Sequence, residues 1–443
     1  GDLAAAAEGG GILFLTQADT DILALSKVVP RLDASAPPVH AYNLSHLTTD
    51  DDVEAFLAAT LPLAEVIVLR LIGGRPSFRR GFDLVVDHVQ RHDKWLVCLP
   101  GTDTLDPELA AVSNVGIPVA HEAFAYLQLG GLKNYENLLR FLSDHLLMTG
   151  LGWDPPTPQP RHGVYHPDLP EATLDAWRRR ADPSRPTIGV LFYRSHLLSG
   201  NTDFVDALVR IGEARGANVL PVYAYSLKEY PEEENGSSGR GLPSALRYFV
   251  AGDRPIVDVI VNTTSFALGG GEGRPSSETG ADRGWSVDVM RWLDVPMIQA
   301  ITASTSREQW AASQRGLPPL DTAMNVAIPE FDGRIIGVPI SFKERVATDG
   351  AACDGPGCSN PPSLGSPVVH YAPDEERVHR IVGQALRLAA LRRKPNSEKR
   401  VAFVLTNYNA RASRIANAVG LDSPASLVRL LAAMARAGYR VDG

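Results

Sequence analysis

One segment of the chain combines side chains that bind anions with a side chain that handles protons. Arg194, Ser195 and His196 directly follow the apolar run 187–193, and Asn201 comes five residues after His196. A guanidinium or an amide can bind a carboxylate, and an imidazole can accept a proton or bind a metal. Ligands of open α/β sheets bind beyond the carboxyl ends of the strands. The segment therefore predicts a ligand site, although a capped turn with a hydrogen-bonded histidine would have the same sequence.

A second polar segment ends another apolar run. Residues 262–265 read Asn-Thr-Thr-Ser after the run that starts at residue 257. Thr264 would line one crevice with Arg194 if both strands belong to one sheet, because the carboxyl ends of parallel strands meet at the same edge. Ordinary turn chemistry is the alternative interpretation.

The cysteines, paired histidines and glycines give less specific signals. Cys353 and Cys358 have a C-x4-C spacing, but a structural zinc site needs four ligands and the sequence has no second pair. A surface loop or a local disulfide is the alternative for them. His162 and His166 lie in a proline-rich stretch that predicts no helix to bring their rings together. The glycine-rich stretch 269–275 lacks the lysine of a Walker A motif, so we expect no ATP site in this chain.

The hydrophobic pattern predicts the elements that position these residues. Short apolar runs alternate with amphipathic stretches, which is typical of βα units and a parallel sheet. We expect strands at 12–16, 39–43, 66–72, 95–99, 187–193, 217–223, 257–262, 295–300 and 400–405. We expect helices at 19–33, 78–92, most of 122–151, 201–215, 282–293, 306–315, 374–393 and 424–436. The predicted fold class is α/β: a multidomain chain with repeated doubly wound, mostly parallel sheets and flanking helices.

Composition shifts divide these elements into four regions. Residues 1–153 are predicted to form an N-terminal α/β domain, and 154–186 a proline-rich linker with a helix. Residues 187–370 are predicted to form a second Rossmann-like domain. Residues 371–443 would supply a helix and the start of a further α/β domain. Because a lone βα unit cannot bury both faces of its strand, we expect the chain to be a portion of a longer protein.

Length, charge and cysteine content narrow the class of function. The 443 residues are 44% apolar and 21% charged, which is ordinary for a globular protein. The formal net charge of −8 argues against a nucleic-acid or membrane-surface binder, which would have a basic excess. No run of 18 apolar residues exists, so we expect no membrane span. Three cysteines cannot form a disulfide framework, which favours a reducing, cytoplasmic location.

Several long stretches resemble one known family, in the family's order. They are residues 12–21, 189–201, 329–336, 338–344, 394–403 and 413–422. The chain is similar to the large, CobN-type subunits of aerobic cobaltochelatase, whose family also contains the large subunits of magnesium chelatase, known as the H type. Residues 12–21 and 418–422 look more like the cobalt branch. A family hallmark, His-Gly-Thr-x-Glu-Trp, does not occur in this chain. We therefore expect it to correspond to the N-terminal portion of such a subunit.

The resemblance implies a reaction and partners. It implies ATP-dependent insertion of Co²⁺ into hydrogenobyrinic acid a,c-diamide in cobalamin (vitamin B12) biosynthesis, with ATP and Mg²⁺ bound by AAA+ partner subunits of the S and T types. The chemistry requires a base for the pyrrole protons, ligands that help Co²⁺ shed water, and an apolar pocket with donors for carboxylates. The candidates for substrate binding are Arg194, Ser195, Asn201 and Thr264, and those for proton or metal handling are His196, Glu330 and Glu344.

Three other interpretations stay open at this point. The chain could belong to the magnesium branch and bind protoporphyrin. It could be a non-catalytic scaffold that docks the AAA+ motor, which the absence of the hallmark motif favours. A sensor of the periplasmic-binding-protein type is the third, but the N-terminal residues 1–10 have no secretory pattern.

Overall fold

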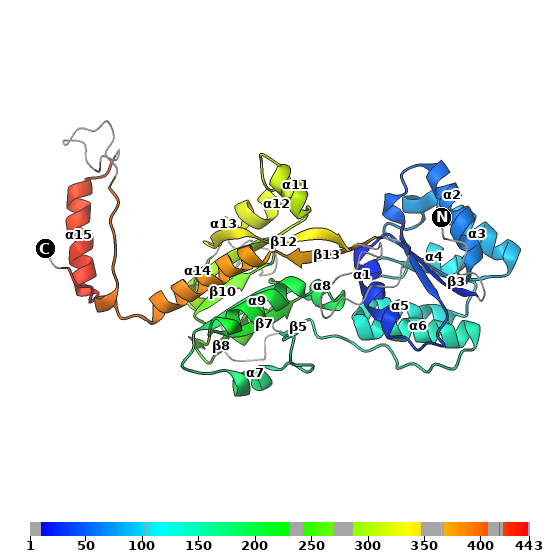
Figure 1. Cartoon of the computed structure of the whole chain (residues 1–443), viewed down its shortest axis with the longest axis horizontal. Helices are drawn as coiled ribbons and strands as arrows, with labels where there is room; N and C mark the ends of the chain where they lie inside the picture. Colours follow the sequence, from blue (N-terminus) through cyan, green and yellow to red (C-terminus); the bar gives the residue numbers. More distant parts are fainter. Residues whose placement is uncertain are drawn as a thin grey trace, which may run out of the picture.

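The computed structural model describes residues 10–102, 104–230, 242–268, 287–346, 365, 367–405, 416 and 420–441. Figure 1 shows two α/β lobes that lie side by side, and a C-terminal segment that extends beyond the second lobe. Each lobe is built on its own, mostly parallel sheet with helices packed against it. This arrangement confirms the predicted fold class.

The first lobe is a four-stranded parallel sheet in the order β2-β1-β3-β4. Its strands are β1 (Gly11–Thr16), β2 (Val39–Asn43), β3 (Ala64–Leu71) and β4 (Trp95–Pro100). Its helices are α1 (Asp19–Val28), α2 (Asp50–Thr60), α3 (Arg79–His92), α4 (Pro107–Val112), α5 (Ile117–Leu129) and α6 (Leu132–Leu147). Ile12 and Phe14 of β1 belong to the core on one face, and Leu13 and Leu15 to the core on the other. A strand buried on both faces explains the continuous apolar run in the sequence.

The second lobe has a seven-stranded sheet in the order β13-β12-β11-β10-β6-β7-β5. Its strands are β5 (His162–Val164), β6 (Thr187–Tyr193), β7 (Asn218–Ala224), β10 (Val259–Asn262), β11 (Met297–Ala303), β12 (Ile335–Val346) and β13 (Val368–Pro373). The central strands run parallel, and β5 and β13 are antiparallel edge strands. A separate small hairpin is formed by β8 (Val250–Ala251) and β9 (Arg254–Pro255).

The helices of the second lobe include three short ones that the sequence did not indicate, α8 (Arg194–Leu198), α12 (Pro319–Thr322) and α13 (Ile328–Glu330). The others are α7 (Leu174–Arg180), α9 (Asp203–Ala214), α10 (Asp288–Leu293), α11 (Arg307–Ala312) and α14 (Glu375–Arg393), with a π-helical turn at Ala323–Ala327. The sequence predicts no helix between the strand at 187–193 and residue 201, but α8 begins directly after β6. Gly200, with a φ of +69°, separates α8 from α9.

The proline-rich segment is held by two asparagines of α6. The Asn137 side-chain oxygen accepts from the Asp154 N–H at 2.7 Å. Asn134 accepts from the Thr157 N–H at 3.0 Å and donates to the Thr157 carbonyl at 2.9 Å. The following residues pair with β7 as strand β5. The segment thus supplies an edge strand to the second sheet, while the predicted domain boundaries stay a prediction.

A hairpin of the second lobe reaches the first lobe. Strands β12 and β13 pair antiparallel and extend toward α1 of the first lobe (Figure 1). Val368 of β13 is 3% exposed within the core that contains residues of α1. Lys343 of β12 forms a 2.9 Å ion pair with Asp19, the first residue of α1. Lys27 donates to the Gly200 carbonyl. Apolar and ionic contacts therefore join the two lobes.

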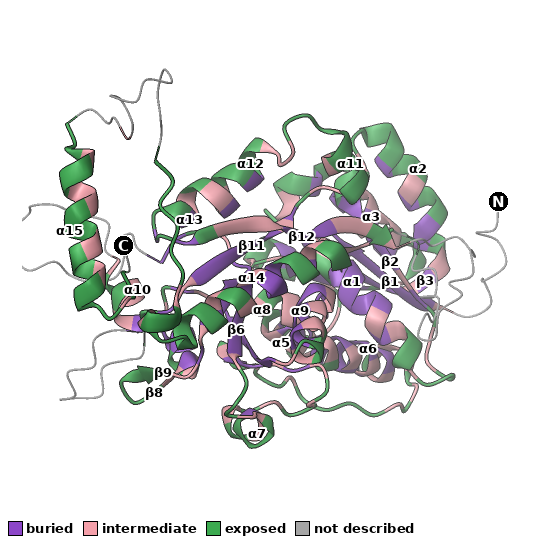
Figure 2. Ribbon diagram, turned by 60° about the vertical axis from the view of Figure 1, so that its left-hand side comes forward, coloured by how far each residue is buried: buried purple, intermediate pink, exposed green. Residues whose placement is uncertain are grey.

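The C-terminal segment has no core of its own. Helix α14 packs on the second sheet, but α15 (Ser423–Arg436) contains no buried residue (Figure 2). The strand expected at 400–405 is wrong for this chain, since the described residues 401–405 pair with no strand and are exposed. Their apolar side chains have no sheet to join. Within the described ranges, the structure also has no helix long and apolar enough to cross a membrane.

Candidate functional site

Arg194 and Ser195 lie on the short helix α8, at the carboxyl end of β6. The Arg194 guanidinium donates to the backbone carbonyls of Pro160 at 2.8 Å and Gln159 at 2.9 Å. Arg194 therefore anchors the proline-rich segment to α8. Ser195 is exposed, and its carbonyl accepts from the Ser199 hydroxyl at 2.9 Å.

His196 lies on the same helix among aromatic rings. Its ring packs edge-on against Phe204 of α9 and Tyr371 of β13, with centroids 5.0 and 5.4 Å apart. Burial lowers the pKa of His196 to about 4. The imidazole is therefore neutral at pH 7, with a lone pair free for a metal or a hydrogen bond, but a group with this pKa is a weak base there.

Asn201 joins the turn after α8 to the hairpin. Its side-chain oxygen accepts from the Tyr371 N–H at 2.9 Å, and the residue is 7% exposed. Beside it, the His370 ring nitrogen Nδ1 lies 2.9 Å from the Asp203 carboxylate. Arg194, His196 and Asn201 thus share one region, and their contacts hold the α8 turn, the linker and β13 together.

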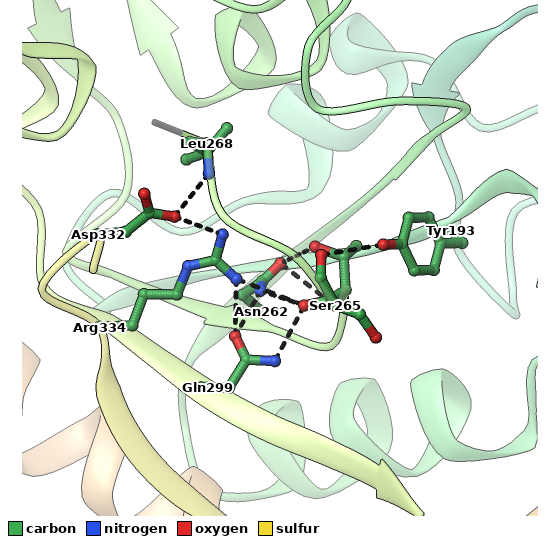
Figure 3. A network of polar contacts seen from close by, with 8 residues as sticks. Tyr193, Asn262, Ser265, Leu268, Gln299, Asp332 and Arg334 are labelled. Carbon is green, nitrogen blue, oxygen red and sulfur yellow. Dashed lines mark hydrogen bonds and ion pairs between the residues drawn. The ribbon is translucent and has the colours of Figure 1, made fainter. Parts of the chain in front are cut away.

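Thr264 belongs to a second, buried polar network, which Figure 3 shows around β10 and β11. The Thr264 hydroxyl donates to Asn262 at 2.8 Å, and the Asn262 amide donates to Gln299 at 2.7 Å. All three residues are 0% exposed. The loop that follows β10 is fixed by these bonds, because buried polar groups need hydrogen-bond partners.

An arginine–aspartate pair completes this network (Figure 3). The Arg334 guanidinium donates to Asp332 at 2.7 Å and to Gln299 at 2.8 Å, and the Leu268 N–H donates to the same Asp332 oxygen at 2.7 Å. The side chains of Arg334 and Asp332 are 0% and 1% exposed. Burial lowers the pKa of Arg334 from its ordinary value, against the opposing charge of Asp332. Breaking such a pair strands a buried charge.

Glu330 is the predicted residue that lines a cavity. The cavity measures about 560 Å³ and lies at the amino-terminal edge of β11 and β12, beside α10 and the end of α14. Glu330 is exposed; its backbone carbonyl accepts from the Gly333 N–H at 2.9 Å, but its side chain makes no hydrogen bond or ion pair with any residue that the structure describes. Its carboxylate is therefore available to a ligand in the cavity.

Glu344 lies elsewhere, on the hairpin. Its carboxylate accepts from the Arg307 N–H at 2.6 Å, at the start of α11. The predicted site residues are thus distributed over the α8 region, the buried network, the cavity and the hairpin. Asn201 links the α8 region to the hairpin, and Asp332 belongs to both the buried network and the wall of the cavity, but the predicted residues themselves lie at separate positions. The structure does not gather them into one site.

Of the candidate metal ligands, the two histidines have described positions and the two cysteines do not. His166 lies 3.1 Å from Glu213 and His162 lies 3.3 Å from the Tyr248 hydroxyl, so both histidines fasten the linker. In the described part of the chain, no group of three or more His, Cys, Asp or Glu could hold a metal ion. Cys353, Cys358 and the glycine-rich stretch lie outside the described residues. Cys98 is a buried residue of β4, and burial raises the pKa of its thiol to about 12.

The sequence interpretation missed Asp332, Arg334 and Gln299. A signal for the first two was present, because two opposite charges flank Gly333 directly before the apolar residues 335–336. Gly333 has a φ of +72°, which lets the chain turn between them. Gln299 gave no signal beyond a polar residue inside an apolar run.

Comparisons with known proteins agree with the fold. The family model described as CobN/Magnesium Chelatase matches residues 124–443. The aerobic cobaltochelatase subunit CobN of Pseudomonas aeruginosa is 36% identical over 98% of this chain and 32% of its own length. The H-type large subunit of magnesium chelatase from Rhodobacter capsulatus is 30% identical over 71% of this chain and 25% of its own length.

A solved structure leads to the same family. The catalytic subunit of cobaltochelatase from Mycobacterium tuberculosis matches with a TM-score of 0.70 and 35% identity, over 98% of this chain and 32% of that chain. This chain spans about a third of the length of these cobaltochelatase relatives. It belongs to the CobN/magnesium chelatase family.

Proposed function

We propose that the chain is part of the large subunit of a cobaltochelatase, which inserts Co²⁺ into hydrogenobyrinic acid a,c-diamide in the cytoplasm. AAA+ partner subunits of the S and T types would hydrolyse ATP, in agreement with the absence of a Walker A motif from this sequence. The observation that supports this most is the match to CobN, with 36% identity over 98% of the chain. The H-type magnesium-chelatase relative matches 71% of the chain, which favours the cobalt branch.

In this proposal, most of the predicted site residues have a positioning role, and one exposed acid has a chemical role. Arg194, Asn201 and Thr264 are engaged with their own chain and would hold the lobes in shape for the substrate. Glu330 is the strongest candidate to accept a pyrrole proton, because it lines a cavity and its carboxylate is uncommitted among the described residues. The neutral His196 would serve as a ligand for Co²⁺ in transit.

A scaffold that docks the AAA+ motor is the second candidate function. The observation that favours it is the separation of the predicted site residues, most of which bind their own chain. The two candidate functions predict that the isolated chain, added to a complete reaction, would bind different components. A scaffold would capture motor subunits, whereas a substrate-binding portion would capture the tetrapyrrole.

An inhibition experiment tests this. An excess of the 443-residue chain is added to complete cobaltochelatase, and Co²⁺ insertion is followed by absorbance. We expect inhibition that extra hydrogenobyrinic acid a,c-diamide relieves and extra AAA+ subunits do not. Relief by AAA+ subunits alone would favour the scaffold. Inhibition of magnesium chelatase but not of cobaltochelatase would overturn the cobalt assignment.

A further inference from the structure

Two arginines from different helices place their guanidinium groups over one glycine of α14. A Cβ atom at Gly383 would lie 3.2 Å from Arg215 Nη1 and 3.6 Å from Arg387 Nη1. Arg215 is the C-cap residue of α9, and its Nη1 donates to the His379 carbonyl of α14 at 2.9 Å. Helices α9 and α14 lie side by side and share one core (Figure 1). Their packing therefore holds two like charges close to one point.

Neither of these guanidinium groups has a carboxylate partner in the part of the chain that the structure describes. Three other arginines of α14 show the contrast. Arg393 lies 2.9 Å from Asp258, and Arg377 and Arg392 each have a carboxylate oxygen 3.9 Å away. Two like charges at short range repel each other, so a bound anion would be favourable there.

Gly383 is what allows the two arginines to meet. Glycine in the interior of a helix lowers its stability relative to alanine. A Cβ atom at this position would approach Arg215 more closely than side chains ordinarily do. The missing side chain thus leaves room for a guanidinium from α9 to lie across α14 beside Arg387.

The positive charge continues along the same face of α14. Arg380 precedes Arg387 by seven residues, and Lys394 follows it by seven, which is a spacing of about 10.5 Å along a helix. Both are exposed and form no ion pair with any residue of described position. Leu391, which is 50% exposed, lies between the last two charges. Residues 380–394 include no aspartate or glutamate.

We propose that this basic row, formed by Arg215, Arg380, Arg387 and Lys394, is a docking surface for an acidic segment of a partner protein. The planar guanidinium fork matches a carboxylate, and Leu391 offers an apolar contact beside the charges. The whole chain has a formal net charge of −8, which disfavours the phosphate backbone of a nucleic acid as the occupant. The surface involves neither the metal nor the ring, so this inference goes beyond the proposed function.

The test is a fluorescence anisotropy titration of a labelled, glutamate-rich helical peptide with the 443-residue chain at low ionic strength. We expect saturable binding that weakens as salt is added, because salt screens exposed charges. The double variant Arg215→Ala/Arg387→Ala should raise Kd at least about fivefold. The matched control Arg31→Ala/Arg79→Ala removes the same charge from exposed positions of the first lobe and should change Kd less than twofold. A peptide with glutamine in place of each glutamate should not bind.

A second variant tests the surface without removing an arginine. Gln384→Glu places a carboxylate about one helical turn from both Arg380 and Arg387, where it would pair with them in place of the partner. We expect it to raise Kd in the same direction as the double variant, whereas Gln384→Ala should leave Kd unchanged. Circular dichroism would show that each variant is folded.

The outcomes decide between the possible occupants. Equal Kd values for wild type, Arg215→Ala/Arg387→Ala and Gln384→Glu would overturn the docking surface, as would the absence of saturable peptide binding at low salt. Binding of a labelled single-stranded oligonucleotide in preference to the peptide would also overturn it and assign the row to nucleic acid. None of these measurements uses Co²⁺ insertion, so the proposed function is tested separately.

Discussion

The ammonium group of Lys343 lies 2.9 Å from the carboxylate of Asp19 and ties the hairpin of the second lobe to the first helix of the first lobe. Burial acts to raise the pKa of Asp19, but the hydrogen bonds from Lys343 and Asn43 and the positive charge of Lys343 outweigh it, so the pKa lies below its ordinary 3.8. The contact is therefore complete at neutral pH.

A double-mutant cycle with Asp19→Asn and Lys343→Met should measure this contact. Since both side chains are about one-third exposed, we expect a coupling free energy of about 0.2–1 kcal/mol at pH 7. A carboxyl with a lowered folded pKa stabilises above its unfolded pKa, so the coupling should vanish as the pH falls below 3.8. Coupling that persists in full at pH 2 would contradict the ion pair. The exposed pair Arg80–Glu54 lies within the first lobe and serves as a control ion pair that does not connect the lobes.

The stability of the second lobe should fall as the pH is lowered toward 4. The pKa of His196 is about 4 when folded and 6.5 ordinarily, so the unfolded chain binds more protons between these values. The free energy of unfolding therefore decreases with falling pH in this window. His196→Phe should reduce that slope in chemical denaturation, and His379→Gln, at an exposed position, should leave it unchanged. An unchanged slope in His196→Phe would show that the ring is not buried in its neutral form.

Removal of the buried cation should be among the costliest single changes. Arg334→Met removes the buried cation that faces the Asp332 carboxylate, and we expect a loss of about 3–5 kcal/mol in the free energy of unfolding. Urea denaturation measures it. Arg178→Ala removes an exposed pair with Asp175 and should stay within about 0.5 kcal/mol. Similar losses for both variants would contradict a structural role of the Arg334 network.

Removal of residues 400–443 should leave the two lobes as stable as before. Helix α15 has no buried residue, and Val404 is 91% exposed, so the described residues of this segment contribute little packing to the lobes. We expect a change of less than about 0.5 kcal/mol in the main unfolding transition. The shortened chain should also bind less of a hydrophobic dye. A clearly less stable chain would mean that the segment packs on the lobes in solution.

The sequence predicted the four strands of the first lobe and β6, β7, β10 and β11 of the second, because a strand buried on both faces leaves a continuous apolar run, but it did not predict β5, β12 and β13. Residues 187–193 are one case, since the observed β6 has the same bounds. Helix α8 was missed because five residues are too few for a helical period to appear. The strand at 400–405 was expected from its apolar residues, yet it has no neighbour in this chain.

The candidate site was harder to predict than the fold. Arg194 and Asn201 have the chemistry of ligand-binding groups, but their donors and acceptors bind backbone of distant segments, which no local pattern reveals. Arg334 lies within hydrogen-bond distance of Gln299 because β11 pairs with β12, which a local sequence pattern does not reveal. Glu330 was identified from its motif, and its place on a cavity depends on α10 and α14, which lie far away in sequence.

The most direct test of the central claim is binding of the tetrapyrrole to this chain. Hydrogenobyrinic acid a,c-diamide and protoporphyrin are titrated separately into the folded 443-residue chain, and the absorbance band of each ring is followed. The account predicts saturable binding of the corrin precursor, with a shifted band and at least tenfold preference over protoporphyrin. Equal affinity for both rings, or a preference for protoporphyrin, would contradict it.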